Sequence, residues 1–323
     1  MRKRALVVGI NNYPRSPLNG CINDANDISN ILKTHENGNP NFSVKEIHDV
    51  ATKGDLIGEI KELFNGENDT ALFYFSGHGS INELGGYIIT PDFSENDLGV
   101  SMEDILKLAN GSKTKNRIII LDCCYSGAIA NPNIEHGSLC TINKGVTILT
   151  ASRDCESAIE SNGRGIFTTL LLEGLKGGAA NLEGKVTPSS IYAYIDQALG
   201  AWQQRPVFKT NVTEFNPIRE VNPQVSKDII RKLKEYFSSP SEEFKLDPSF
   251  EYTNSNHVEH EIVNPYADDN NVKIFKNLQK LAGVGLIVPV GEEHMYFAAM
   301  HSKSCKLTAL GQYYWKLVTE TRL

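Results

Sequence analysis

Two short apolar segments constrain the fold of this chain most strongly. TALFYFSGHG occupies residues 70–79, and NRIIILDCCYSG occupies residues 116–127. Each is a run of branched and aromatic residues that ends in glycine and small polar residues, which is typical of a buried parallel strand reaching the carboxyl edge of its sheet. Open α/β sheets hold their ligands at this edge. We therefore expect His78, after the first strand, to lie close to Cys124, after the second.

The remainder of residues 1–215 alternates between strand and helix patterns. Strands are predicted at 4–10, 43–50, 85–92 and 145–152 and in QRPVFKT, and helices at 21–34, in GDLIGEIKELF after Thr52, in EDILKLA, in GRGIFTTLLLEGL and after Thr187. Such alternation predicts an α/β fold, in which helices flank a doubly wound, mostly parallel sheet.

The length of 323 residues indicates more than one domain. Prolines become frequent after residue 215, and we interpret 216–268 as a linker with one helix near 226–237. In 269–323, KIFKNLQKLAGVGLIVPV predicts a helix, a turn and a strand. MYFAAMHSKSCKLTALGQYYWKLV predicts a strand pair and a closing helix. This small α+β module resembles a winged helix-turn-helix.

Composition excludes several classes of function. The formal charge of −7 argues against binding to nucleic acid or to an anionic membrane surface. No stretch approaches the roughly 18 apolar residues of a membrane span, and the first apolar run meets Asn11 and Asn12 without a cleavage-like stretch. The six cysteines are spread through the chain, as in a reducing compartment. We expect a cytoplasmic protein.

The two strand ends carry the groups that nucleophilic catalysis needs. A cysteine nucleophile requires a base within hydrogen-bond reach and donors for the developing oxyanion. His78 and Cys124 are the candidate base and nucleophile, and the neighbouring glycines, such as Gly79, allow close backbone approach. The alternative interpretation is a core histidine and a small buried cysteine without catalytic function.

Three motifs give this pattern a specific resemblance. SGHG, DCCYSG and GCINDA are similar to motifs of the caspase-like cysteine peptidases, and within them of the metacaspases and bacterial orthocaspases. GIFTTLLLEGL and QRPVF also resemble that family, so the similarity covers about 1–210. The family pattern D-x-C-x-S-G selects Cys124 and leaves Cys123 at the variable position. Tyr125 stands where the pattern often has histidine.

This resemblance implies peptide-bond hydrolysis by a Cys–His dyad. The sulfur of Cys124 would attack the carbonyl carbon, and His78 would protonate the leaving amine. The backbone N–H groups of Gly79 and Cys124 would bind the oxyanion. The family needs no third, acidic member of a triad.

The resemblance also implies a substrate preference. Asp24 and Asp122 match the family's acidic pocket for the side chain before the cut, and Cys21 and Ser76 match its walls. Two carboxylates in a partly desolvated pocket repel each other unless a cation binds. We therefore expect a protein or peptide substrate cut after Arg or Lys. In the alternative interpretation, Asp24 caps a helix and Asp122 makes a strand-end hydrogen bond.

Regulation is less constrained by the sequence. Many metacaspases need calcium, but Asp92, Asp97 and Asp104 match no calcium-loop spacing. We therefore expect no cofactor, with calcium dependence as the alternative. Self-cleavage after Lys144 is a further hypothesis. Residues 224–323 contain 12 Lys or Arg and 13 Asp or Glu, a net charge of −1 that argues against a DNA reader.

We expect a regulatory module with a protein partner, in a bacterial defence or cell-death enzyme. The alternative is a non-catalytic regulatory protein, or a winged-helix DNA-binding protein, on a caspase-like scaffold.

Overall fold

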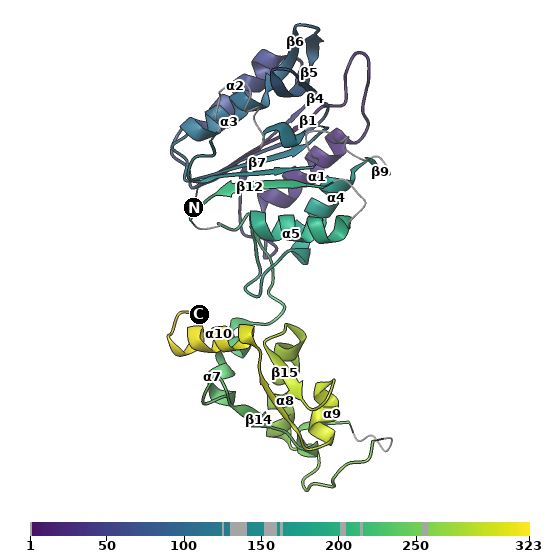
Figure 1. Ribbon diagram of the computed structural model, residues 1–323, viewed down its shortest axis with the longest axis vertical. Helices are drawn as coiled ribbons and strands as arrows, with labels where there is room; N and C mark the ends of the chain where they lie inside the picture. Colours follow the sequence, from purple (N-terminus) through teal and green to yellow (C-terminus); the bar gives the residue numbers. More distant parts are fainter. Residues whose placement is uncertain are drawn as a thin grey trace. The chain divides into compact units, whose positions relative to one another are not determined.

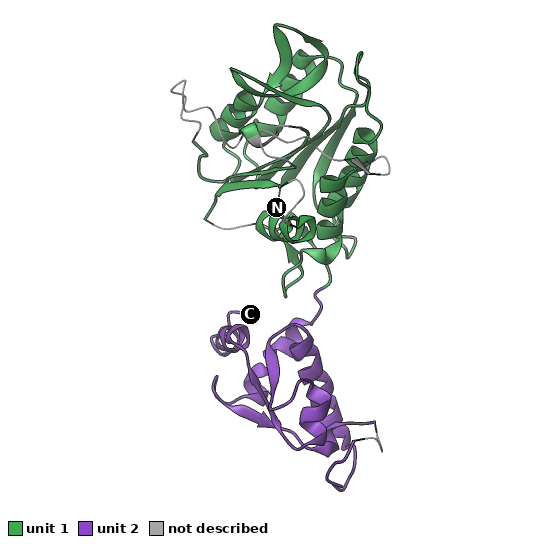
Figure 2. Ribbon diagram, turned by 45° about the vertical axis from the view of Figure 1, so that its right-hand side comes forward, with its two compact units in different colours: residues 1–222 green, residues 223–323 purple. Residues whose placement is uncertain are grey.

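A computed structural model describes residues 2–124, 126–129, 141–151, 160–161, 164–200, 205–213, 216–253 and 258–323. The chain divides into two compact units, Met1–Asn222 and Pro223–Leu323 (Figure 2). The first carries both strands singled out above, and each unit is described by itself.

A six-stranded sheet forms the centre of the first unit (Figure 1). Its strand order is β12-β8-β7-β3-β1-β2. Neighbouring strands among β1, β2, β3, β7 and β8 are parallel. The edge strand β12 is antiparallel to β8. The bounds are β1 Lys3–Gly9, β2 Ser43–His48, β3 Thr70–Ser76, β7 Asn116–Asp122, β8 Val146–Thr150 and β12 Val207–Asn211.

Helices cover both faces of this sheet, as the doubly wound prediction requires. One face packs on α2 (Lys53–Phe64) and α3 (Met102–Gly111), and the other on α1 (Cys21–Lys33), α4 (Ile166–Glu173) and α5 (Pro188–Leu199). Successive side chains of a strand point to opposite faces. In β3, Phe73 and Phe75 therefore join the first core, while Leu72 and Tyr74 join the second. The predicted α/β architecture is confirmed.

Two predicted helix starts are formed by the threonines that precede them. Thr52 Oγ1 accepts a hydrogen bond from the N–H of Asp55 at the start of α2. Thr187 forms a reciprocal capping box with Ser190 at the start of α5. These bonds satisfy backbone donors that the first helical turn leaves without an intrahelical partner.

A second, antiparallel sheet begins directly after His78. It consists of β4 (Gly79–Asn82), β5 (Gly85–Ser94) and β6 (Asp97–Ser101). The short elements of the first unit are η1 Ser126–Ile129, β9 Glu160–Ser161, β10 Arg164–Gly165, η3 Gly174–Gly178, β11 Lys185–Val186 and β13 Arg219–Glu220.

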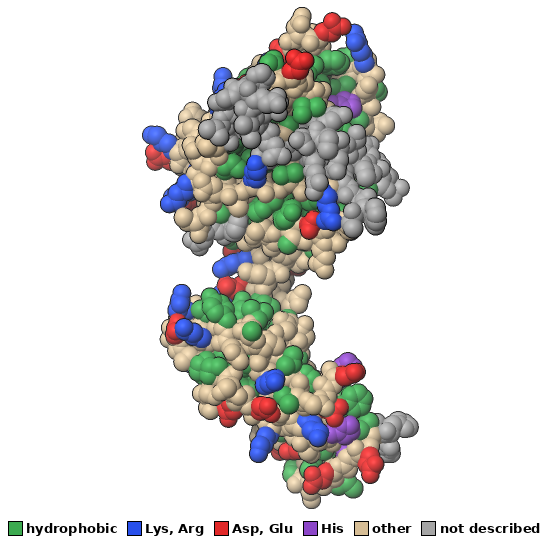
Figure 3. Space-filling model, in the orientation of Figure 1, with side chains coloured by type: hydrophobic (Ala, Val, Ile, Leu, Met, Phe, Trp, Pro, Cys, Tyr) green, Lys and Arg blue, Asp and Glu red, His purple; other side chains and the backbone are tan. Residues whose placement is uncertain are grey.

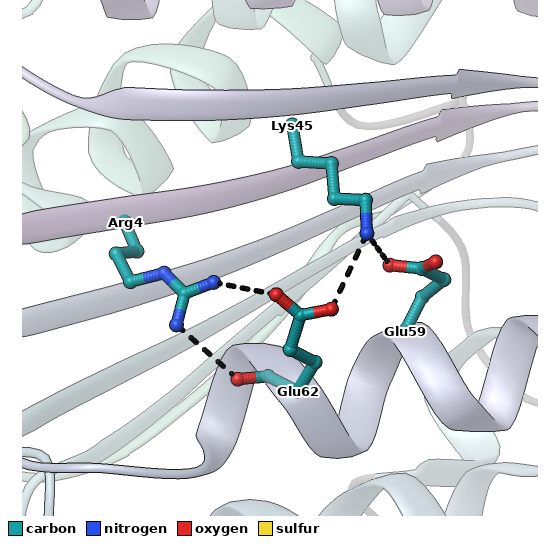
Figure 4. A network of polar contacts seen from close by, with 4 residues as sticks. All are labelled: Arg4, Lys45, Glu59 and Glu62. Carbon is teal, nitrogen blue, oxygen red and sulfur yellow. Dashed lines mark hydrogen bonds and ion pairs between the residues drawn. The ribbon is translucent and has the colours of Figure 1, made fainter.

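A network of ion pairs links α2 to the β1 and β2 side of the main sheet (Figure 4). The carboxylate of Glu62 lies 3.1 Å from Arg4 and 3.3 Å from Lys45, and Lys45 also pairs with Glu59. All four side chains are partly exposed, and solvent screens such pairs. The buried apolar side of α2 therefore contributes most of its docking energy.

The second unit is built around a three-stranded antiparallel sheet of order β14-β16-β15. Its elements are α6 Lys227–Arg231, α7 Leu233–Tyr236, β14 Glu243–Lys245, η4 Pro248–Phe250, α8 Asp269–Gly283, β15 Ile287–Val290, α9 Met295–Met300, β16 Ser304–Leu307 and α10 Ala309–Thr319. None of the helices within the described ranges is long and apolar enough to cross a bilayer.

Two features of this unit differ from the sequence-based expectations. The segment 216–268, expected as a linker, contributes β14, which pairs with β16 inside the unit. The segment MYFAAM is the helix α9, so its prediction as a strand was wrong. Met295, Ala298 and Ala299 are buried at helical spacing, a pattern that so short an apolar run does not distinguish from a strand. The winged-helix resemblance stays a prediction.

The surface of the second unit mixes charges of both signs. On the face seen in Figure 3, Lys and Arg side chains alternate with Asp and Glu, and hydrophobic side chains gather over α10. Leu310 and Tyr313 of α10 are 46% and 58% exposed.

Candidate active site

The pairing of β3 with β7 brings the two predicted catalytic residues to adjacent strand ends. The strands are parallel, and Ser76 lies opposite Asp122 in their register. Just beyond this pair, the N–H of Gly77 donates to the carbonyl oxygen of Asp122 at 3.4 Å. His78 lies two residues after Ser76, and Cys124 lies two residues after Asp122. Both are half-buried. The sheet therefore delivers both groups to the same edge.

The imidazole of His78 is oriented by the loop that follows β1. Nε2 lies 2.7 Å from the carbonyl oxygen of Ser16. Because a carbonyl oxygen only accepts hydrogen bonds, Nε2 carries the proton, and Nδ1 of the neutral ring keeps its lone pair. The backbone N–H of His78 donates to the hydroxyl of Tyr13 at 3.0 Å, and the two ring centroids are 4.5 Å apart.

Tyr13 was not predicted from the sequence as a site residue. Its hydroxyl also donates to the carbonyl oxygen of Ile89 at 3.3 Å, which ties the loop after β1 to β5. Burial raises the pKa of Tyr13, so the phenol stays neutral and keeps its proton. One feature of the sequence could have indicated this role: Tyr13 is an aromatic residue directly after Asn11 and Asn12, where the first strand pattern ends.

The structure distinguishes the two adjacent cysteines. Cys123 is 1% exposed, and burial raises the pKa of its thiol well above the ordinary value, with the neighbouring Asp122 adding to the effect. Cys124 is half-buried. Since the thiolate is the nucleophilic form, Cys123 is unsuited to attack a substrate at neutral pH, whereas Cys124 has solvent access.

Gly79 lies against the backbone of Cys124. A Cβ at position 79 would overlap the carbonyl oxygen of Cys124 and would lie 3.0 Å from the sulfur of Cys123. Gly79 is held there by its pairing with Ile88 in the small sheet. Glycine at this position thus permits close contact between the main chains that follow β3 and β7.

The two predicted pocket carboxylates converge on one glycine. Oδ2 of Asp24, in the first turn of α1, accepts from the N–H of Gly165 at 3.2 Å and from Ser76 Oγ at 3.4 Å. Oδ2 of Asp122 accepts from Thr168 Oγ1 at 2.6 Å. A Cβ on Gly165 would overlap Asp122 Oδ2 and lie 3.4 Å from Asp24 Oδ2, so both carboxylates face the same backbone.

All four residues assigned to the pocket are buried together. Asp24 and Asp122 are 2% and 6% exposed, and Cys21 and Ser76 are also buried. The pKa of Tyr74 is raised, first by burial and then by the charges of Asp122 and Asp24. Burial is the main cause of this shift, and the contribution of the two charges places both acids near Tyr74.

Gly165 and Thr168 are site residues that sequence reasoning missed. Thr168 Oγ1 lies 2.6 Å from both Asp122 Oδ2 and the hydroxyl of Tyr74. The carboxylate only accepts, so the threonine proton goes to Asp122, and Tyr74 donates to Thr168. Their segment GRGIFTTLLLEGL was predicted only as a helix, although its glycine and threonines were a usable signal.

The acidic residues considered for calcium serve other contacts. Asp92 accepts from the N–H of Lys53 at 3.1 Å and from Thr90 Oγ1 at 2.6 Å, and Asp97 pairs with Lys53 Nζ at 2.8 Å. Asp104 lies in the first turn of α3. In the part of the chain that the structure describes, no three His, Cys, Asp or Glu side chains are grouped to hold a metal.

The peptide bond after Lys144 is held at the start of β8. The carbonyl oxygen of Lys144 accepts from Arg117 Nη2 at 2.9 Å, and the N–H of Gly145 donates to the carbonyl oxygen of Asn211 at 2.6 Å. These bonds oppose the hypothesis of self-cleavage there, because a scissile carbonyl must enter an active site. Tyr125 lies outside the described residues.

Comparison with known proteins places the first unit in a known family. The model of the caspase domain family matches residues 2–233. Metacaspase-1 of Scheffersomyces stipitis is 39% identical over 88 residues, covering 24% of this chain and 22% of the relative. Metacaspase-1 of Candida glabrata is 29% identical over 150 residues, covering 40% and 38%. The chain thus matches about a fifth to two fifths of the length of these relatives.

Two solved structures share the fold. Caspase-1 from Spodoptera frugiperda superposes with a TM-score of 0.51 at 13% identity, covering 68% of this chain and 91% of that protein. A Geobacter sulfurreducens protein superposes with a TM-score of 0.52 at 18% identity, covering 69% and 100%. The family match extends over the sheet, its helices and both strand ends, and the chain belongs to the caspase domain family.

Proposed function

We propose that this protein is a cysteine endopeptidase with Cys124 as nucleophile and His78 as base. The observation that carries the proposal is the in-register pairing of Ser76 with Asp122, which puts His78 and Cys124 at neighbouring strand ends. The proton of His78 Nε2 is committed to Ser16, so Nδ1 is the nitrogen available to exchange a proton with the thiol.

The reaction proceeds in two steps. The thiol proton of Cys124 passes to Nδ1 of His78 as the sulfur forms a bond to the substrate carbonyl carbon, and the C–N bond breaks as His78 delivers that proton to the leaving amine. Water then attacks the thioester, gives its proton to His78 and releases the acid and the thiol. Backbone N–H groups at Gly79 and Cys124 stabilise the oxyanion, a role supported by the close contact of these two main-chain segments.

The same proposal assigns substrate selection to the acidic pair. Asp24 and Asp122 are buried, and both face Gly165. Two carboxylates repel each other more strongly in a buried site than in water, because the surroundings screen their charges less. The positive charge of an arginine or lysine side chain of the substrate relieves this repulsion. We infer cleavage after Arg or Lys, with Gly165 and Thr168 shifting as the basic side chain enters.

A peptide library tests the activity, the dyad and the specificity together. Wild type, Cys124→Ala and Cys123→Ala are incubated with the library, with and without calcium. Turnover after Arg or Lys by wild type and Cys123→Ala, with none by Cys124→Ala, is the expected result. Equal turnover by Cys124→Ala, or no turnover by wild type under either condition, contradicts the proposal.

The acidic pair has a matched control on the same helix. Asp24→Asn should lower kcat/KM for Arg-linked substrates by at least about tenfold, because it removes a buried charge that faces the substrate cation. Asp27→Asn, one turn later in α1, removes the same charge outside the pocket and should leave kcat/KM nearly unchanged. Unaltered specificity in Asp24→Asn would refute the assignment.

We further propose that the second unit regulates the first through a protein partner. Support comes from its separate compact fold and from the exposed Leu310 and Tyr313 on α10. A specific protease site placed between Asn222 and Pro223 in the full chain provides the test. Cutting there after folding should change kcat/KM, and identical kinetics before and after the cut would speak against regulation.

A further inference from the structure

The small sheet that begins after His78 has an outer edge close to the candidate active site. Its strand order is β4-β5-β6, so within the described residues β4 has a strand partner on one side only. β4 starts at Gly79, which lies against the backbone of Cys124. The outer edge of β4 therefore begins beside the proposed nucleophile.

The hydrogen bonds between β4 and β5 determine which backbone groups face this outer edge. In an antiparallel pair, hydrogen-bonded and non-hydrogen-bonded residue pairs alternate along the strands. The N–H of Ile89 donates to the carbonyl oxygen of His78 at 2.9 Å, so these two residues form a hydrogen-bonded pair. Gly79 and Ile81 then occupy the pairs that are not hydrogen-bonded. The N–H of Gly79 and both backbone groups of Ile81 therefore point away from β5.

Two large apolar side chains are exposed on the same hairpin. Ile81 is 40% exposed, and Leu84, in the turn before β5, is 78% exposed. Among the described residues of the first unit, no other large hydrophobic side chain is as exposed as these two. Edge strands are often protected by a lysine or a proline, and β4 contains neither. Outward-facing backbone groups next to an apolar surface are typical of an edge that binds an extended peptide.

The two faces of the main sheet indicate which part of a substrate reaches β4. Asp24 lies on α1 and Gly165 directly precedes α4, and both helices pack on one face. The small sheet packs with α2 and α3 on the other face, through residues such as Ile88 and Val100 (Figure 1). A substrate with its basic side chain at the acidic pair on the first face extends past the strand ends toward β4 on the second.

We propose that the outer edge of β4 binds the part of the substrate that follows the cut, and that Ile81 selects a large apolar side chain there. This inference rests on the proposed peptidase function and narrows the substrate class of the same site. With the scissile carbonyl oxygen at the N–H of Gly79, Ile81 lies two residues further along the strand, a distance of about 7 Å. Two residues of an extended peptide span the same distance, so the second residue after the cut lies beside Ile81. Leu84 extends the apolar surface into the turn.

A pair of peptides tests this preference by turnover. Two internally quenched peptides carry arginine before the cut and differ only at the second residue after it, which is leucine in one and serine in the other. Wild type should cleave the leucine peptide with about tenfold higher kcat/KM, the discrimination that an apolar contact provides. Ile81→Ala should reduce this ratio to about one. Ser80→Ala is the matched control and should keep the ratio, because successive side chains of a strand lie on opposite faces.

A second substitution separates the backbone contact from the side-chain contact. Ile81→Pro removes the outward N–H as well as the side chain, and the sheet tolerates proline there because this N–H takes no part in the pairing of β4 with β5. Compared with Ile81→Ala, it should lower kcat/KM for both peptides about fivefold, the effect of one neutral hydrogen bond. Equal kinetics of the two variants, with both folded by circular dichroism, would refute backbone pairing along this edge.

Binding to an inactive variant separates this inference from the peptidase proposal. Full-length Cys124→Ala protein is titrated calorimetrically with the same two peptides, and the leucine peptide should bind about tenfold more tightly. Turnover by wild type with equal kcat/KM for both peptides overturns the inference about β4 and leaves the peptidase proposal standing. Absence of turnover, together with tighter binding of the leucine peptide that Ile81→Ala abolishes, overturns the peptidase proposal and supports the binding edge. Absence of turnover with equal binding, or with no binding, overturns both.

Discussion

Replacement of Thr168 by valine removes one hydroxyl from the buried chain of hydrogen bonds beneath the candidate active site. Valine has nearly the shape of threonine, so little cavity is created. Thr168 is fully buried, and it lies 2.6 Å from both Asp122 Oδ2 and the Tyr74 hydroxyl. A hydrogen bond to a charged group contributes about 1.5–3 kcal/mol and a neutral one about 1 kcal/mol. The expected loss of unfolding free energy is therefore about 2–4 kcal/mol.

Thermal unfolding followed by circular dichroism measures this loss. For a unit of this size, about 2–4 °C of Tm correspond to each kcal/mol, so the transition of the first unit should fall by about 4–16 °C. Thr168→Ser keeps the hydroxyl and should lose much less. Thr169→Val removes the hydroxyl of an exposed neighbour, which donates to the carbonyl oxygen of Gly165 at 3.0 Å. Water can replace this exposed bond, so Tm should shift by no more than about 2 °C. A Thr168→Val protein as stable as Thr169→Val would refute the reasoning.

Three further predictions concern the candidate site and a buried cysteine of the second unit. Tyr13→Phe removes the acceptor of the His78 backbone N–H and should lower kcat about tenfold with little change in KM; an unchanged kcat would contradict this positioning role. Gly79→Ala should abolish turnover and lower Tm, because the new Cβ overlaps the Cys124 carbonyl oxygen; a fully active variant would show that the contact is dispensable. Burial raises the pKa of Cys305 to about 12, so only about one thiol in ten thousand is ionised at pH 8. Mass spectrometry after brief iodoacetamide treatment of the folded protein should find Cys305 unmodified, and rapid labelling would contradict its burial.

Local patterns predicted most elements of the first unit because each pattern is contained in its own segment. The apolar run ending at Ser76 and the one ending at Asp122 are the buried strands β3 and β7. The threonines before α2 and α5 form the predicted caps, since a cap depends on residues within one helical turn. The same local reasoning failed for α9, where six apolar residues are compatible with either a strand or a helix.

The sequence alone determined which residues stand at the strand ends, since His78 and Cys124 follow β3 and β7 in the chain whatever else the fold does. Only the tertiary structure decided what surrounds them. The proton on His78 Nε2 depends on Ser16, 62 residues away, and the approach of Gly165 to Asp24 spans 141 residues. Strand order, the antiparallel edge strand β12 and the pairing of β14 with β16 likewise depend on distant segments. Such contacts arise from packing of the whole sheet and its helices, and no periodicity within one segment encodes them.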